Sequence, residues 1–154
     1  MSATAESRLA DLGITLPEPS APVANYVPFV QTGNLLFVSG QVPIVDGKPA
    51  FLGRCGETIS TDDAVAAARA CAVNLITQVK AATGDLERVA RVVKLIGFVN
   101  SAPGFTDQPK VINGASDLMV EVFADKGRHA RSAVGVAALP LGVSVEVEGT
   151  FEIG

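Results

Sequence analysis

VSVEVEGTFEI, residues 143–153, alternates apolar and polar side chains along nearly all of its length. Such alternation is typical of a β-strand with one apolar face and one polar face. A second strand is predicted at Arg131–Ala137, where small and apolar residues dominate, and residues 139–142 (LPLG) connect the two. The C-terminal part of the chain therefore belongs to a β-sheet.

Three further strands are predicted upstream. Residues 88–99 are rich in Val and Ile and are apolar at both parities in their second half, which is typical of a strand covered on two sides. Tyr26–Val30 and Asn34–Ser39 flank the turn residues 31–33 and predict a hairpin. Residues 43–57 contain several glycines and prolines, so we expect an irregular loop at the surface.

Two long helices are predicted between these strands. The first runs from Thr61, which we expect to cap it, to Gly84, and apolar residues recur along it at three-and-four spacing. The second covers Val111–Phe123 and is weakened by Gly114. A short helix is expected at Ser7–Leu12. The apolar stripes comprise Val65, Ala68, Ala72, Leu75 and Val79 in the first long helix, and Ile112, Ala115, Leu118, Met119 and Val122 in the second.

The numbers of helices and strands predict an α+β fold. With about five strands and only two substantial helices, the helices can cover one face of a mixed sheet but not both. Self-association through the second face is the natural solution. The 154 residues fit one domain, which we place at 26–154, preceded by an arm at 1–25 that holds the short helix and a proline-rich segment at 16–22.

Composition excludes several classes of function. A net charge of −4 and no long basic run argue against nucleic-acid binding. The cysteines, Cys55 and Cys71, lie outside any C-x-x-C pattern and there is one histidine, so we expect no metal site, no disulfide framework and free thiols. The largely apolar stretches at 35–45 and 133–145 are broken by Gly and Pro and fall short of the roughly 20 residues of a membrane helix, and no signal peptide is evident, so we expect a cytoplasmic protein.

Five polar residues in apolar strand or helix contexts are the candidates for chemistry. Arg131 can pair with a substrate carboxylate, or belong to a structural ion pair. Glu146 can act as a general acid or base, or be a solvated strand carboxylate like its neighbours. Ser39, Tyr26 and Asn113 fit a binding site, but they equally fit a turn serine, a packing tyrosine and a helix-capping residue.

A hydrolytic serine site is not expected. The sequence has no G-x-S-x-G motif, and His129 is the only histidine available to any Ser–His pair. We therefore expect His129 to be a surface or interface residue.

Two motifs carry a resemblance to a known family. Residues 33–43 read GNLLFVSGQVP and residues 130–140 read ARSAVGVAALP, with Tyr26 ahead of the first motif and VEVE at 145–148 after the second. From about Tyr26 to Ile153, the chain resembles the Rid/YjgF family of imine and enamine deaminases, often labelled L-PSP endoribonucleases.

The resemblance implies a chorismate-mutase-like homotrimer whose helices lie outside and whose sheets face a central barrel, with active sites in the clefts between subunits. By the same resemblance, Arg131 would hold a substrate carboxylate and the backbone of Ala133 would add a contact. Ser39, Tyr26 and Asn113 would line the pocket. Glu146 matches the acidic residue that positions the attacking water. Ala133 stands where the best-known deaminases have cysteine.

The implied reaction is hydrolysis of a 2-imino acid, derived from an enamine such as 2-aminoacrylate, to a 2-keto acid and ammonia. No metal or organic cofactor is needed, and the ligand is a small carboxylate-bearing imine or keto acid. Three alternatives stay open: a non-catalytic module that binds or senses small acids, an endoribonuclease, which the acidic charge disfavours, and an aminomuconate-type deaminase of a degradative pathway.

Overall fold

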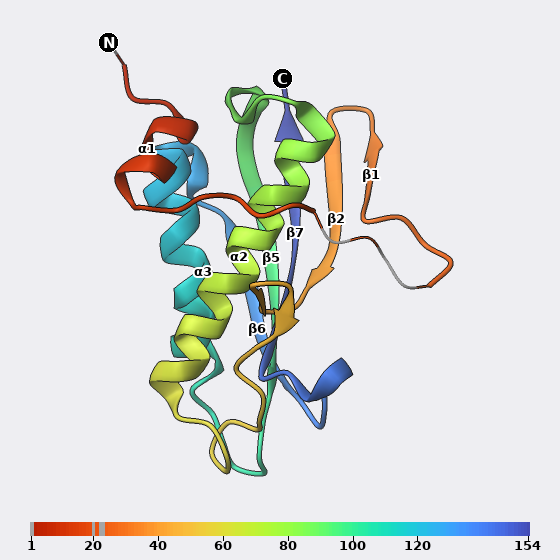
Figure 1. Ribbon diagram of the computed structural model, residues 1–154, viewed down its shortest axis with the longest axis vertical. Helices are drawn as coiled ribbons and strands as arrows, with labels where there is room; N and C mark the ends of the chain where they lie inside the picture. Colours follow the sequence, from red (N-terminus) through yellow and green to blue (C-terminus); the bar gives the residue numbers. More distant parts are fainter. Residues whose placement is uncertain (1, 20, 22–23) are drawn as a thin grey trace.

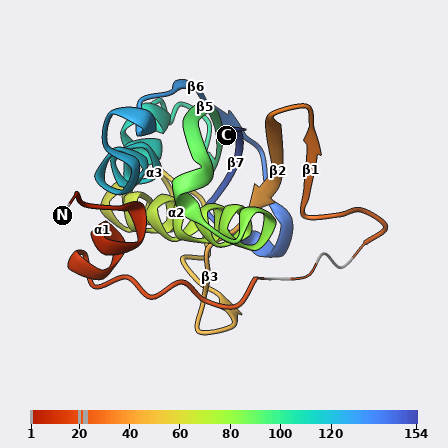
Figure 2. The same ribbon diagram turned by 90° about the horizontal axis from the view of Figure 1, so that it is seen from above.

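The structure, a computed structural model, describes residues 2–19, 21 and 24–154 and confirms the α+β fold. Two long helices lie against one face of a five-stranded sheet, and a short N-terminal helix packs beside them (Figures 1 and 2). Met1, Ser20, Pro22 and Val23, which belong to the expected arm, lie outside the described residues.

The sheet has the strand order β1-β2-β7-β5-β6. The hairpin β1–β2 and the pairs β2–β7 and β7–β5 are antiparallel, whereas β6 runs parallel to β5. A parallel pair needs a long crossover, and helix α3 supplies it. The alternating C-terminal stretch therefore becomes the central strand, β7. The strands span Phe29–Thr32 (β1), Leu35–Gln41 (β2), Val89–Asn100 (β5), Ala130–Val136 (β6) and Val145–Ile153 (β7).

The two long helices form where the sequence predicts them, at Thr61–Thr83 (α2) and Gln108–Phe123 (α3). The expected cap at Thr61 is wrong, because the Ser60 hydroxyl accepts the hydrogen bond from the backbone N–H of Asp63 at 3.1 Å. Gly84 ends α2 with a φ of 75°, as expected.

Gly114, which weakens α3 as an isolated helix, has a packing role. A Cβ atom added at this position would lie 2.1 Å from the backbone oxygen of Val65 in α2. The missing side chain therefore allows α2 and α3 to pack at close range, and α3 is placed by that contact.

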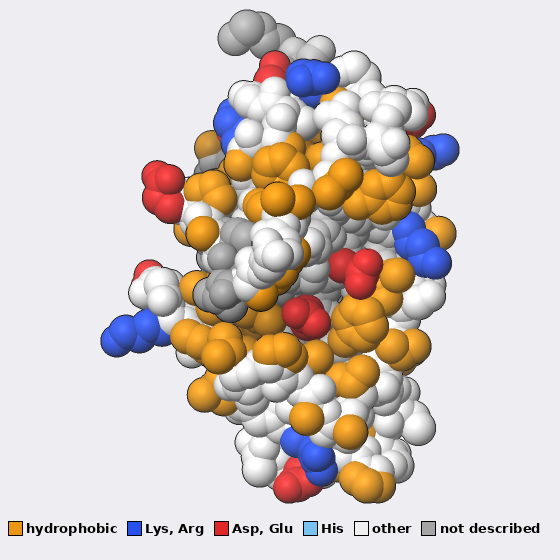
Figure 3. Space-filling view, turned by 90° about the vertical axis from the view of Figure 1, so that its right-hand side faces the viewer, with side chains coloured by type: hydrophobic (Ala, Val, Ile, Leu, Met, Phe, Trp, Pro, Cys, Tyr) orange, Lys and Arg blue, Asp and Glu red, His pale blue; other side chains and the backbone are white. Residues whose placement is uncertain are grey.

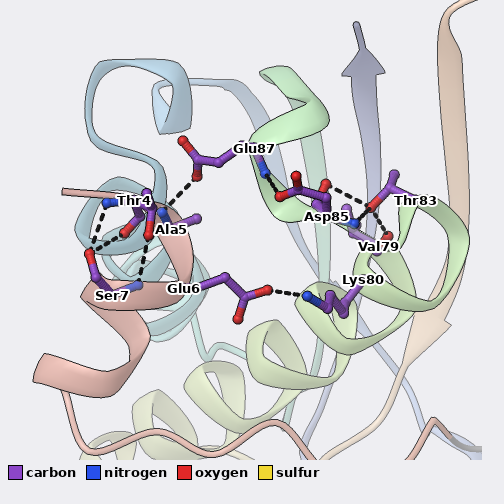
Figure 4. Close-up of polar contacts among 9 residues, drawn as sticks. All are labelled: Thr4, Ala5, Glu6, Ser7, Val79, Lys80, Thr83, Asp85 and Glu87. Carbon is purple, nitrogen blue, oxygen red and sulfur yellow. Dashed lines mark hydrogen bonds and ion pairs between the residues drawn. The ribbon is translucent and has the colours of Figure 1, made fainter. Parts of the chain in front are cut away.

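The N-terminal helix α1 (Ala5–Asp11) is fixed to the rest of the chain. The carboxylate of Glu87 accepts a hydrogen bond from the first backbone N–H of α1 at 2.8 Å, and Glu6 forms an ion pair with Lys80 of α2 (Figure 4). Leu9 is 3% exposed and belongs to the main core. These contacts dock α1 on the C-terminal end of α2.

The connection between β2 and α2 corrects the expectation of an irregular surface loop at 43–57. It contains a small hairpin, β3 (Ile44–Val45) with β4 (Lys48–Pro49), and Cys55 is fully buried. The backbone N–H of Cys55 donates to the carbonyl of Asn100 at 2.7 Å, which ties this segment to the end of β5. Short 3-10 helices occupy Leu86–Arg88, Ala124–Gly127 and Pro140–Gly142.

The face of the sheet opposite α2 and α3 carries apolar side chains that no helix covers. Val30, Phe37 and Val134 are 54%, 45% and 43% exposed, and Ile96 and Phe98 between them are half-buried. The side of the molecule that carries the β1–β2 hairpin shows hydrophobic side chains gathered around acidic ones (Figure 3). In the described residues, no helix is both long and apolar enough to span a bilayer.

Candidate functional site

Arg131 lies on the edge strand β6 and points toward α3. Its partner on β5 is Leu95, which is fully buried beneath the helices, so the two side chains share the helix-covered face. The Arg131 guanidinium Nη1 donates to Asn113 Oδ1 at 2.8 Å and to Ser116 Oγ at 3.2 Å. Both hydrogen-bond acceptors are neutral. The bond to Asn113 places that residue beside Arg131, which is compatible with a pocket that both residues line.

No carboxylate of the described residues forms an ion pair with Arg131. The ion pairs found across residues 2–19, 21 and 24–154 involve other basic side chains, and Arg131 is half-buried. The structural ion pair that the sequence left open is absent from this part of the chain. A half-buried cation held by neutral hydrogen-bond acceptors retains its charge for an anionic ligand.

Sequence reasoning missed Ser116, which links Arg131 to the single histidine. Ser116 Oγ lies 2.9 Å from His129 Nε2, and His129 Nδ1 lies 2.6 Å from the carbonyl oxygen of Gly127. His129 is half-buried and joins the cluster around Arg131. The available signal was the i,i+3 spacing of Asn113 and Ser116, which places both on one face of a helix.

Glu146 lies on the central strand and points to the uncovered face. It alternates with the buried Val145 and Val147 and pairs with Phe98. A β-bulge interrupts the pairing of β2 with β7 between Val38 and Gln41, and it brings Gly40 against the Glu146 side chain. A Cβ added at Gly40 would lie 2.9 Å from Glu146 Cδ.

The environment of Glu146 changes its acidity. Partial burial, and secondarily the negative charge of Glu148, raise the pKa of the Glu146 carboxyl above its usual value. A raised carboxyl pKa brings the group closer to neutral pH, where it can both accept and donate a proton. The close approach of Gly40 in the bulge also singles out Glu146 among the three strand carboxylates that the sequence alone did not separate.

Ser39 is next to Gly40 in the bulge of β2, and Tyr26 lies in the segment that precedes β1. Ser39, beside Gly40 in the bulge, donates a hydrogen bond from its hydroxyl to the carbonyl of Val27 at 3.2 Å. This bond holds the segment that carries Tyr26 beside β2. Tyr26 precedes β1, which begins at Phe29 and not at the predicted position, and its side chain is 54% exposed.

The candidate residues form two groups on opposite faces of the sheet. Arg131, Asn113 and the half-buried Ala133 lie on the helix-covered side at the β6 edge. Glu146 and Ser39 lie on the uncovered side, and strand β5 separates β7 from β6. One chain therefore does not bring Arg131 and Glu146 together.

Neither the cysteines nor the cavity beside α1 adds to these groups. Cys55 and Cys71 are free and buried, and burial raises the pKa of both thiols. No cluster of three His, Cys, Asp or Glu side chains suited to a metal occurs among the described residues. A cavity of about 710 Å³ lies between the N-terminal segment and α2, lined by Leu9, Ile14 and Thr77 among others, and no candidate residue borders it.

Comparisons with known proteins agree with this fold. The profile of the family described as "YjgF/chorismate_mutase-like, putative endoribonuclease" matches residues 6–148. The crystal structure of Atu1372 from Agrobacterium tumefaciens, a protein of unknown function, is 52% identical with a TM-score of 0.92, covering 97% of this chain and 92% of that one.

Two further relatives have names or titles that mention a ligand or a reaction. A 2-iminobutanoate/2-iminopropanoate deaminase of Dermatophagoides farinae is 32% identical over 91% of this chain and 94% of its own. The structure of Escherichia coli TdcF with bound serine is 26% identical with a TM-score of 0.64, covering 91% of this chain and 96% of that one. With its fold, its paired motifs and these relatives, the chain belongs to the YjgF/chorismate mutase-like family.

Proposed function

We propose that this protein is a deaminase that hydrolyses small 2-imino acids to 2-keto acids and ammonia, in sites shared between neighbouring subunits of a homotrimer. The observation that carries the proposal is the state of Arg131, a half-buried guanidinium held by two neutral acceptors and by no carboxylate of the described chain. Such a group is suited to a small organic anion.

The chemistry assigns one task to each group of residues. Arg131 binds and orients the substrate carboxylate, with the backbone at Ala133 adding a contact. Glu146 holds a water against the C=N carbon and takes one of its protons as the C–O bond forms. That proton goes to the imine nitrogen and gives a tetrahedral carbinolamine, which carries OH and NH2 on one carbon. Glu146 then takes the hydroxyl proton and passes it to the amine, which leaves as ammonia as the C–N bond breaks and the carbonyl of the keto acid forms. Ser39, Tyr26 and Asn113 line the pocket.

A site shared by subunits follows from the placement of the two groups. Arg131 and Glu146 lie on opposite faces of one sheet, so a reaction that needs both draws them from different chains. The uncovered face carries the exposed side chains of Val30, Phe37 and Val134, which supply apolar area for self-association. A cyclic trimer would place the β6 edge of one subunit against the Glu146 face of the next.

The relatives support this choice of reaction and ligand. One relative, at 32% identity, is named a deaminase of 2-imino acids, and the TdcF structure contains serine, a small molecule with a carboxylate. The net charge of −4 speaks against RNA as the substrate, although the family description includes endoribonuclease.

The test couples the purified protein to a dehydratase that releases 2-aminoacrylate and follows keto-acid formation over time. We expect the protein to accelerate keto-acid release over the spontaneous rate, and Arg131→Ala to remove the acceleration while the circular dichroism spectrum stays that of the wild type. Spontaneous rates in the presence of wild-type protein would refute the proposal for this substrate.

A second candidate, a module that binds small acids without turnover, is favoured by the serine in TdcF. It predicts that pyruvate or serine raises the melting temperature of the wild type but not of Arg131→Ala, with no acceleration of imine hydrolysis. An aminomuconate-type substrate for the same site would show turnover only with that larger imine.

A further inference from the structure

We propose that Ser116 and His129 are positioning residues that hold the Arg131 guanidinium in one orientation, so that one defined edge of it meets the substrate carboxylate. This inference rests on the proposed role of Arg131 as the carboxylate anchor. It concerns a chain of three contacts: Arg131 Nη1 to Ser116 Oγ at 3.2 Å, Ser116 Oγ to His129 Nε2 at 2.9 Å, and His129 Nδ1 to the Gly127 carbonyl at 2.6 Å.

The donors and acceptors in this series of three contacts allow only one assignment of the hydrogen-bond directions. A guanidinium only donates, so the Ser116 oxygen accepts from Arg131 and its own proton is free to be donated. The Gly127 carbonyl only accepts, so His129 carries its proton on Nδ1. A neutral imidazole with that tautomer has a bare Nε2, which accepts the Ser116 proton. Each of the three contacts thus joins one donor to one acceptor.

Backbone packing fixes Gly127, at the end of this series of contacts. A Cβ added at Gly127 would lie 2.2 Å from the carbonyl oxygen of Met119 in α3, so the 3-10 turn Ala124–Gly127 lies directly on the helix that carries Ser116. Both supports of the imidazole, one from the turn and one from α3, therefore belong to a single rigid unit. The position of the Ser116 hydroxyl is set by this unit and not by solvent.

The contacts also decide which edge of the guanidinium is available. Nη1 has two hydrogens, and Asn113 Oδ1 and Ser116 Oγ accept them. Among the described residues, no acceptor is found for the hydrogens of Nε and Nη2. Those atoms form one edge with two parallel N–H groups, which matches the two oxygens of a planar carboxylate. We infer that the substrate carboxylate lies in the guanidinium plane on the Nε/Nη2 edge.

The experiment compares Ser116→Ala and His129→Ala with variants that retain the hydrogen bonds. Ser116→Thr keeps a hydroxyl, and His129→Gln keeps an acceptor near the place of Nε2. Glu121→Gln is the matched control, because Glu121 lies on the same helix and its ion-pair partner within the described part of the chain is Arg69, not Arg131. Each variant is assayed for KM and kcat with the imine formed from 2-aminoacrylate, for pyruvate affinity by calorimetry, and for melting temperature.

We expect Ser116→Ala and His129→Ala to raise KM, and to weaken pyruvate binding, by about tenfold, since a hydrogen bond to a charged group is lost or loosened. kcat should change less than KM, and Ser116→Thr and His129→Gln should restore most of the affinity. Glu121→Gln should behave as the wild type. A purely structural role would lower the melting temperature without this split between KM and kcat.

Wild-type KM and pyruvate affinity in both alanine variants would overturn the inference while leaving the proposed reaction intact. Equal losses in Ser116→Ala and Ser116→Thr would also overturn it. If the wild type binds pyruvate but shows no turnover, the proposed function fails, and a tenfold weaker pyruvate affinity in Ser116→Ala still supports the positioning role. A wild type that neither binds pyruvate nor turns over the imine overturns both.

Discussion

Replacing Gly114 with alanine tests how the packing of two helices places the residues around Arg131. In an exposed helix interior, the change from Gly to Ala stabilises by roughly 0.5–1 kcal/mol. Here the new methyl carbon would lie 2.1 Å from the Val65 backbone oxygen, whereas ordinary contact begins at 3.4 Å. The two helices must separate on the order of 1 Å, and overpacking of this kind costs about 1–3 kcal/mol.

The cost should lie near the upper end of that range, because the obstacle is backbone and not a flexible side chain. After subtraction of the gain in helix propensity, we expect Gly114→Ala to lower the free energy of unfolding by about 2 kcal/mol. Urea denaturation followed by circular dichroism, at one fixed protein concentration, should show a midpoint lower by about 1 M.

The exposed Ala66 of α2 provides a calibration for this assay. Ala66→Gly reports helix propensity alone, with an expected loss of about 0.5–1 kcal/mol. Gly114→Ala should also weaken pyruvate binding, since Asn113 and Ser116 flank the displaced residue on α3. A Gly114→Ala variant as stable as the wild type, or more stable, would show that the close contact between α2 and α3 at Gly114 does not place α3.

Three further outcomes concern the charged residues. Arg131→Ala should lower kcat/KM by about thirtyfold to several thousandfold with an unchanged fold. Arg131→Lys should recover little of that kcat/KM, because an ammonium group lacks the planar fork of a guanidinium, and steady-state kinetics with the imine measure both effects. Glu148→Gln should move the acid limb of the pH–rate profile to lower pH, since the Glu148 charge helps to raise the pKa of Glu146, whereas Glu152→Gln should leave the limb in place. Glu146→Gln should abolish turnover and raise the melting temperature at neutral pH. A carboxyl whose pKa is raised in the folded state stabilises the fold below its unfolded-state pKa, and this contribution is lost as the pH rises through the folded-state pKa. The melting temperatures of Glu146→Gln and the wild type should therefore converge in acid.

Local patterns were sufficient to predict most of the sheet and both long helices. The alternation at 143–153 predicted which side chains of β7 are buried, and the stripe from Ala68 to Val79 predicted the buried face of α2. The cap of α2 was misplaced by one residue, since Ser60 and Thr61 are both good capping residues. Cys55 was expected at the surface because glycine-rich composition does not show that a bridge to Ser101 draws the segment inward.

The candidate site was predictable only in part. The family resemblance suggested Arg131, Asn113 and Glu146 as site residues, but the separation of Arg131 from Glu146 depends on the parallel pairing of β6 with β5, which no local pattern specifies. The contact between Ser116 and His129 depends on the turn at 124–127 folding back on α3. The sequence predicted only a surface or interface position for His129, because hydrogen bonds between residues far apart in the sequence have no signature in residue spacing.

Mixing two inactive variants shows whether Arg131 of one chain and Glu146 of another complete each site. Arg131→Ala and Glu146→Gln, unfolded together in equal amounts and refolded, should co-assemble at random. A site is complete when the chain that supplies Arg131 is the Glu146→Gln variant and the neighbour that supplies Glu146 is the Arg131→Ala variant. Random assembly gives this arrangement in about one quarter of the sites, so about one quarter of the wild-type activity should return. No activity in the mixture, with co-assembly verified by native mass spectrometry, would contradict the account.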